Sequence, residues 1–181
     1  MMELNSKNYY SLEADREYMS CSQYQAFLEC EAAEMAKLRG DYVPSKSKAL
    51  IVGNYFHTAF ESEEAHTEFC EENADLIYKK VRKKTGEIEM YSDFEKAEKM
   101  ITAVKNDPLM RTFINMPGEN EKILTGELFG MLWKIRLDKY IPDKRIIIDY
   151  KTTESILTLS YNAKTGRKDS FIETWDYLMR A

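Results

Sequence analysis

Three strand-like runs follow one another in the second half of the chain, after a first half that is patterned for helices. The runs are Glu121–Phe129, Met131–Ile141 and Arg145–Lys151. Gly130 and Pro142-Asp143 separate them, and both are turn signals, so each run is joined to the next by a short connection. Strands with connections this short pair antiparallel, because a parallel pair needs a long crossover. The pattern therefore predicts an α/β fold in which helices flank a three-stranded meander.

Start and stop signals divide the first half into helices. Ser22 followed by Gln25 forms a capping box before one helix, and Gly40 is a suitable stop for it. Ser92 followed by Glu95 repeats the capping box before a later helix. Apolar residues at helical spacing also predict a helix over residues 50–60. The charged residues 63–84 are predicted to be helical as well, and Asp107-Pro108 starts a short helical piece that Pro117-Gly118 ends.

We expect the whole chain, residues 1–181, to form one domain. Residues 1–118 are predicted to be its mainly helical part. Residues 119–181 hold the meander and a final helix from Phe171 onward, and the polar stretch 160–169 is predicted to be an exposed loop.

The composition is typical of a globular protein, with 44% hydrophobic and 31% charged residues. No apolar run approaches the roughly 20 residues needed to cross a bilayer, and the N-terminus lacks the layout of a secretory signal. The three cysteines, Cys21, Cys30 and Cys70, have no C-x-x-C spacing, which argues against a zinc site and favours buried thiols. We therefore expect a cytoplasmic protein.

Charge is unevenly distributed along the chain. The net charge is −5 overall, −9 over residues 1–75 and +4 over residues 76–181. Because DNA-binding domains are generally basic, the acidic balance weakens the case for tight non-specific DNA binding. The acidic half also suits a basic protein partner.

The strongest chemical signal is a pair of aspartates with a lysine. Asp149 and Lys151 follow the apolar run Ile146–Ile148 two residues apart, so on a strand both side chains point to one face. Asp138 lies on the preceding predicted strand, and the intervening turn can bring the two carboxylates side by side. Two carboxylates and an ammonium group suit a hard divalent cation, Mg²⁺ or Mn²⁺, and a reactive water. The alternative is a cross-strand salt bridge, which would contribute little stability.

Three other side chains are weighed beside this set. His57 and Glu61 lie one turn apart on a predicted helix, so His57 is either a metal ligand, a phosphate contact or the partner of Glu61. Glu127, on the first predicted strand, is a further candidate metal ligand and is equally compatible with a surface position. Tyr150 alternates to the opposite strand face from its neighbours and is expected to pack in the core.

These residues together resemble the PD-(D/E)XK nuclease superfamily. Asp138 followed by Asp149-Tyr150-Lys151 is similar to its Asp, Asp-x-Lys pattern. Residues 53–61 are similar to the G-x-x-x-H-x-x-x-E helix motif of its RecB-like branch, and residues 8–20 resemble phage exodeoxyribonuclease VIII-like proteins. The resemblance implies a restriction-endonuclease-like core and a metal-dependent DNA exonuclease of phage or prophage origin.

The resemblance also implies a role for each candidate residue. Asp138 and Asp149 would hold Mg²⁺ or Mn²⁺, with His57 and Glu127 as further ligands. Asp138, Asp149 and Lys151 would form the catalytic set, in which Lys151 orients the attacking water and stabilises phosphate charge.

The chain departs from the RecB-like pattern at its C-terminal end. Members of that branch usually continue the last helix into a Gln-x-x-x-Tyr motif and a further strand, whereas this chain stops at Met179-Arg180-Ala181. We expect a shortened form whose sheet lacks its last strand and so has an open edge. A second copy of the chain or another protein could cover that edge.

The second hypothesis is therefore a catalytically silent inhibitor that binds DNA or protein. The length and acidic N-terminal half are similar to those of some type II anti-CRISPR proteins. That resemblance implies contact with Cas9, whose DNA channel is positively charged, or with its DNA. The intact set of Asp138, Asp149 and Lys151 favours the enzyme over the inhibitor.

Overall fold

The structure is a computed structural model that describes residues 2–45, 47–79, 89–153, 155–163 and 165–174. It divides the chain into two compact units, Met1–Tyr150 and Lys151–Ala181, and each unit is described by itself. The expectation of one domain over the whole chain stays a prediction.

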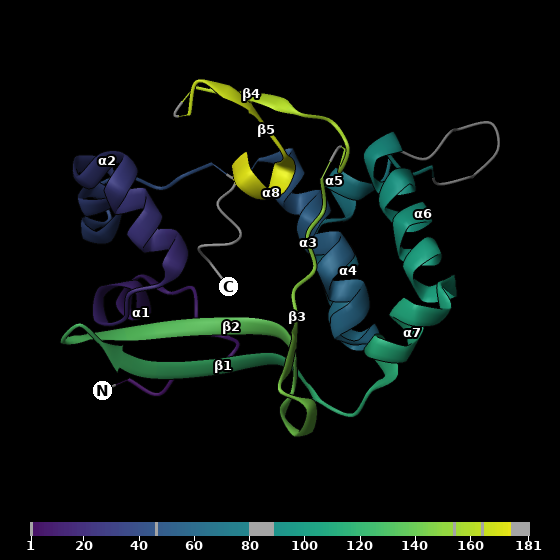
Figure 1. Cartoon of the computed structure of the whole chain (residues 1–181), viewed down its shortest axis with the longest axis horizontal. Helices are drawn as coiled ribbons and strands as arrows, with labels where there is room; N and C mark the ends of the chain where they lie inside the picture. Colours follow the sequence, from purple (N-terminus) through teal and green to yellow (C-terminus); the bar gives the residue numbers. More distant parts are fainter. Residues whose placement is uncertain (1, 46, 80–88, 154, 164, 175–181) are drawn as a thin grey trace. The chain divides into compact units, whose positions relative to one another are not determined.

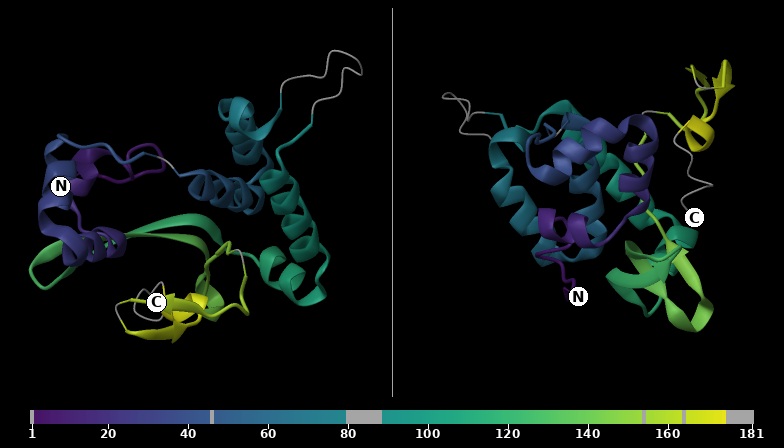
Figure 2. Two further views of the ribbon diagram at one scale, coloured as in Figure 1. Left: turned by 90° about the horizontal axis from the view of Figure 1, so that it is seen from above. Right: turned by 90° about the vertical axis from the view of Figure 1, so that its left-hand side faces the viewer.

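Seven helices lie within the described part of the first unit. They are α1 (Leu12–Glu17), α2 (Cys21–Arg39), α3 (Lys48–Glu61), α4 (Glu63–Glu72), α5 (Ala74–Ile77), α6 (Ser92–Asn106) and α7 (Pro108–Asn115). Helix α3 packs against α4 and α6, α6 packs against α7, and α1 packs against α2. Figures 1 and 2 show α1 and α2 as one group and α3, α4 and α6 as another.

The start of α2 lies two residues earlier than predicted. Its capping box uses Ser20 and Gln23, because the Ser20 hydroxyl accepts from the Gln23 amide at 3.3 Å and the Gln23 side chain accepts from the Ser20 amide. Ser22 and Gln25 match the same sequence pattern, so the pattern alone allowed two overlapping boxes. Gly40 ends α2 as predicted, with a φ of 87° that favours glycine.

Two other helix predictions need correction. Helix α6 begins after Tyr91 without a side-chain cap, so the predicted capping box of Ser92 and Glu95 is wrong. The predicted helix over residues 63–84 is instead α4 and α5, which Asn73 separates. The predicted helix ended in the basic run of residues 79–84, and residues 80–88 lie outside the described residues.

The predicted meander is confirmed. Strands β1 (Glu119–Leu128), β2 (Met131–Ile141) and β3 (Ile146–Ile148) pair antiparallel in the order β1-β2-β3. Phe129 and Gly130 form the first turn with φ values of 54° and 72°, which match the two positive φ angles of a type I′ hairpin turn. A short 3₁₀ turn, Pro142–Lys144, leads into β3. Strand β3 ends earlier than predicted, so Asp149 lies just beyond it.

An aromatic cluster between the helices forms the core of the first unit. It is made of Tyr55, Phe56, Phe60, Ile77, Phe94, Ala97 and Ile101. Full burial of a side chain such as Phe94 contributes roughly 1.5–3 kcal/mol. The Tyr150 ring stacks on Phe60 with a centroid distance of 4.9 Å, so Tyr150 packs in the core as predicted. This contact holds the chain directly after Asp149 against α3.

The N-terminal segment packs along β2, beside which Figure 1 shows α1. The Met19 amide donates to the Leu132 carbonyl and the Lys134 amide donates to the Met19 carbonyl, both at 2.8 Å. The buried Lys134 ammonium donates to Asp15 Oδ1 and to the Tyr9 carbonyl, both at 2.7 Å. A buried charge needs such partners, so these bonds fix the N-terminal segment on the central strand.

The second unit contains a hairpin where a loop was predicted. Strands β4 (Ser160–Asn162) and β5 (Arg167–Asp169) pair antiparallel, so the predicted exposed loop over 160–169 instead contains two short strands. Hydrogen bonds to Asp169 close this hairpin, which is why its polar composition does not make it irregular. Helix α8 (Phe171–Thr174) follows, and the rest of the predicted final helix lies outside the described residues.

One prediction from composition needs correction. The three cysteines are free thiols, and Cys30 is exposed while Cys21 and Cys70 are half-buried, so the preference for buried thiols is wrong for Cys30. Among the described residues, no helix combines the length and apolar character needed to cross a membrane.

Candidate functional site

Asp138 has a glutamate directly across the sheet from it. Asn120 on β1 pairs with Lys139 on β2, so the next residue of β1, Glu121, lies opposite Asp138. Directly opposed residues of antiparallel strands project to the same face, with their Cβ atoms roughly 5 Å apart. Glu121 and Asp138 therefore form a pair of neighbouring carboxylates.

A second aspartate lies on the other side of Asp138. Lys139 pairs with Ile148, so Asp149 lies opposite Asp138, one position beyond the last pair of β3. The Tyr150 amide donates to Asp138 Oδ2 at 2.6 Å, which ties the two strands together where their pairing ends. Glu121 on β1, Asp138 on β2 and Asp149 directly after β3 thus occupy adjoining positions in a row, and we call these three residues the carboxylate row.

Helix α3 brings an imidazole to this row. His57 Nδ1 lies 3.4 Å from Asp138 Oδ2, the same oxygen that accepts the Tyr150 amide. The Asn120 side chain donates to the Glu61 carbonyl at 2.8 Å, so the end of α3 is tied to the start of β1. These contacts place the His57 and Glu61 positions of α3 beside the sheet.

The Glu121 carboxylate lies in an unusual environment. Its Oε2 is 2.8 Å from Arg136 Nε but is enclosed by protein and accepts no hydrogen bond within the described part of the chain. Burial raises the pKa of the Glu121 carboxyl, and Arg136 offsets that rise only in part. The negative charges of Glu61 and Asp138 raise the pKa further, whereas His57 lowers it. The pKa of the Glu121 carboxyl is therefore shifted by four charged or ionisable neighbours, which are Arg136, Glu61, Asp138 and His57.

The backbone of Glu121 is strained as well. Its φ is 51°, a value that non-glycine residues rarely adopt and that costs about 1–3 kcal/mol. Such strain clusters at functional sites, where the surrounding structure maintains it. Glu121 was not among the predicted site residues, although counting residues outward from a two-residue turn at Phe129-Gly130 would have placed it opposite Asp138.

Glu127 lies away from the carboxylate row. It pairs with Leu132 near the hairpin turn and is exposed. It is six residues from Glu121 along β1, which corresponds to roughly 20 Å of strand. Lys151 is the first residue of the second unit, and its predicted role stays a prediction.

The residues of the row fit a hard divalent cation. Carboxylate oxygens with one imidazole nitrogen suit Mg²⁺ or Mn²⁺. The buried Glu121 Oε2 lacks a hydrogen-bond donor, and a cation could satisfy it. Within the described ranges, however, no three His, Cys, Asp or Glu side chains converge as a preformed ligand set. A cation would therefore require some of these side chains to reorient.

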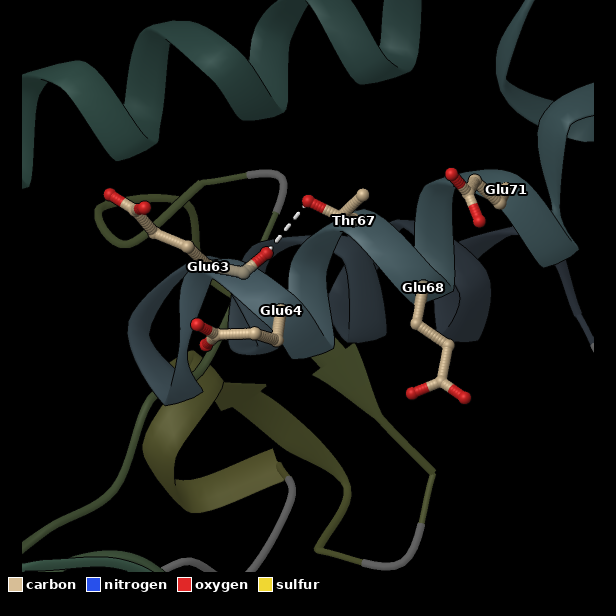
Figure 3. A pocket seen from close by; sticks show the side chains of 5 residues that line it. All are labelled: Glu63, Glu64, Thr67, Glu68 and Glu71. Atoms are coloured by element: carbon tan, nitrogen blue, oxygen red, sulfur yellow. Dashed lines mark hydrogen bonds between the residues drawn. The ribbon is translucent and has the colours of Figure 1, made fainter.

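A different acidic region runs along α4. Glu63, Glu64, Glu68 and Glu71 line an open hollow together with Thr67, whose hydroxyl donates to the Glu63 carbonyl at 2.8 Å (Figure 3). All four glutamates are exposed, and Figure 3 shows their side chains spreading apart from one another. Solvated carboxylates of this kind need no partner, so α4 is not the candidate site.

The chain was compared with protein families, curated proteins and solved structures. None of the curated proteins matches it. The crystal structure of a protein described as "Putative exonuclease" from Eubacterium rectale is similar, with 35% sequence identity and a TM-score of 0.79 over 98% of this chain. This likeness confirms the predicted restriction-endonuclease-like α/β fold. The chain spans 64% of the length of that protein. Residues 20–181 match the family described as "PDDEXK-like domain of unknown function (DUF3799)", and the chain belongs to this family.

Proposed function

We propose that this chain is a metal-dependent deoxyribonuclease that hydrolyses phosphodiester bonds at the carboxylate row. The observation that carries the proposal is the carboxylate row itself, formed on β1, on β2 and directly after β3, with His57 Nδ1 3.4 Å from Asp138 Oδ2. One of these acids, Glu121, pairs with Arg136, and Asp138 lies beside the His57 imidazole. Membership of a PDDEXK-like family supports the same chemistry.

The row would hold Mg²⁺ or Mn²⁺ through Asp138 and Asp149, with Glu121 and His57 as further ligands. When bound, such an ion would polarise a water molecule and offset negative charge on the phosphate. Two contacts to Asp138 Oδ2, from the Tyr150 amide and from His57, hold the central carboxylate in one orientation. This preorganisation lowers the cost of assembling the site.

Lys151 is the proposed partner of the attacking water. An ammonium two residues after Asp149 would orient that water and stabilise charge that develops on the phosphate. Cleavage from DNA ends is the proposed mode, and the description of the similar Eubacterium rectale protein supports it. The net positive charge of residues 76–181 would assist the approach of DNA.

The test is digestion of end-labelled linear DNA and of closed circular DNA with Mg²⁺ or Mn²⁺. We expect the wild type to shorten the linear DNA from its ends and to leave the circle intact. Asp138→Asn and Lys151→Ala should abolish this activity, whereas Glu64→Gln on α4 should not, since Glu64 is exposed and outside the row. Cleavage of the circle would replace the exonuclease by an endonuclease. A folded wild type that cuts neither substrate would overturn the proposal and favour the inhibitor hypothesis.

A further inference from the structure

We propose that Arg136 is a positioning residue that competes with the divalent cation for Glu121 and so sets the cation affinity of the carboxylate row. The inference rests on the proposed function, because it concerns the same site. It assigns to Arg136 a task that the acidic residues and Lys151 do not perform. When Arg136 releases Glu121, the Glu121 carboxylate would become available as a further ligand of the cation.

The position of Arg136 on the sheet supports this role. Arg136 precedes Asp138 by two residues on β2, so the two side chains project to the same face. Arg136 pairs with Ile123, which places it diagonally from Glu121. Its guanidinium therefore reaches Glu121 from beside the row.

The contact involves the atom that a cation would need. Arg136 Nε lies 2.8 Å from Glu121 Oε2, the buried oxygen that accepts no hydrogen bond among the described residues. The side chains are 27% and 13% exposed, so water screens the two charges only in part. A guanidinium and a divalent cation cannot both make their closest contact with one carboxylate oxygen. The pairing of Glu121 with Arg136 accounts for the lack of a preformed ligand set among the described residues.

Aromatic residues of the N-terminal segment hold the guanidinium in this place. Arg136 Nη2 donates to the Tyr10 hydroxyl at 2.8 Å, and the guanidinium carbon lies 4.7 Å from the Tyr10 ring centroid. It also lies 5.6 Å from the Tyr9 ring, and Tyr9 is buried and accepts from Lys134 of the same strand. Arg136 is therefore fixed on two sides and does not swing freely away from Glu121.

The experiment measures Mn²⁺ binding directly, by titration calorimetry and by the paramagnetic resonance signal of free Mn²⁺. Arg136→Met keeps the length of the side chain but removes its charge, and we expect about tenfold tighter Mn²⁺ binding than in the wild type. Arg39→Met is the matched control, because it removes the same charge from the last residue of α2, where Arg39 forms an exposed pair with Asp41, and it should leave the affinity unchanged. Circular dichroism establishes that each variant is folded.

A double variant separates competition for Glu121 from a general effect of charge. In the Glu121→Gln background, Arg136→Met should give no gain in affinity, because the carboxylate for which the two cations compete is absent. Tyr10→Phe removes one hydroxyl from an exposed side chain and should tighten binding by about twofold, which keeps the proposal testable if Arg136→Met does not fold.

The outcomes distinguish this inference from the proposed function. Unchanged or weaker Mn²⁺ binding in a folded Arg136→Met protein would overturn the role of Arg136 while leaving the metal site intact. A gain that persists with Glu121→Gln would also overturn it. If neither the wild type nor any variant binds Mn²⁺ at millimolar concentration, the metal site and this inference fail together.

Discussion

Two enclosed carboxylates, one in each unit, have opposite environments. Asp169 in the second unit is 1% exposed and accepts hydrogen bonds from Asn162, Thr165 and Arg167 at 2.7–2.9 Å. The side chain of Glu121 in the first unit is 13% exposed, and its enclosed Oε2 accepts no hydrogen bond from the described residues. The same chemical group is fully satisfied in one place and incompletely satisfied in the other.

The pKa shifts of the two carboxyls differ accordingly. The hydrogen bond from Thr165, assisted by those from Arg167 and Asn162, lowers the pKa of Asp169 despite its burial. Burial raises the pKa of Glu121. A buried acid with a full set of donors stabilises the local fold, whereas a buried acid without them retains binding capacity. We therefore expect Asp169 to be structural, whereas Glu121 is the acid that we propose as a cation ligand.

The largest expected effect is a loss of DNA cleavage when Glu121 is substituted. Glu121→Gln should lower the rate of DNA cleavage by about 10- to 100-fold, because it removes a negative ligand from the row. Cleavage is measured on end-labelled DNA at saturating Mg²⁺. Glu127→Gln on the same strand is the matched control and should change the rate by less than about twofold, since Glu127 is exposed and distant. Equal losses in both variants would break the distinction between the two glutamates.

The next effect concerns local stability around Asp169. Asp169→Ala removes the acceptor of three hydrogen bonds, so its donors lose their partner and the β4–β5 hairpin should open more often. Hydrogen exchange of the hairpin amides should accelerate by roughly tenfold or more. Lys168→Ala, at an exposed neighbouring position, is the control. Unchanged exchange in Asp169→Ala would contradict a structural role.

The pH dependence of stability should have opposite signs for the two acids. The pKa of Glu121 is raised above 4.5, so its contribution is present below pH 4.5 and is lost as the pH rises through its folded pKa. The pKa of Asp169 is lowered below 3.8, so its contribution is present above pH 3.8 and is lost as the pH falls through its folded pKa.

Urea unfolding with EDTA, at several pH values, measures both trends. The unfolding free energy of the wild type minus that of Glu121→Gln should decrease as the pH rises above 4.5. The corresponding difference for Asp169→Asn should decrease as the pH falls below 3.8. Slopes of the same sign would show that the two carboxyls share one kind of environment.

The sequence predicted the meander but not every strand end. Turn signals at Gly130 and Pro142 gave the order and pairing of the strands, because short connections allow only antiparallel neighbours. The end of β3 was overestimated because Tyr150 leaves the strand to stack on Phe60, a contact between elements distant in sequence. Local patterns carry no information about such a contact.

Only part of the candidate site could be predicted, because the rest depends on contacts between elements that are distant in sequence. Asp138 and Asp149 were found from their motif, and register places them opposite each other. Glu121 was missed because its role depends on the exact register of β1 against β2, which the sequence analysis did not count. On α4, the His66 ring centroid lies 4.7 Å from that of Tyr55, and His66 Nδ1 lies 2.9 Å from Thr58 Oγ1. The many charges of α4 concealed the side of the helix that is only half-exposed.

The smallest effects are expected on α4, where exposed acids provide the baseline for the comparison of buried ones. Glu63 begins the helix next to its N-cap, Ser62, whereas Glu71 lies in the last turn. A negative charge is favourable near the N-terminus of a helix and unfavourable near its C-terminus. Glu63→Gln should therefore lower the free energy of unfolding by about 0.3–1 kcal/mol, and Glu71→Gln should raise it by a few tenths of a kcal/mol.

Urea unfolding at low and at high salt measures both changes, which should shrink as salt screens the charges. Shifts of equal sign, or a loss above about 1 kcal/mol, would mean that the α4 glutamates have partners and that exposure alone does not separate structural from functional acids.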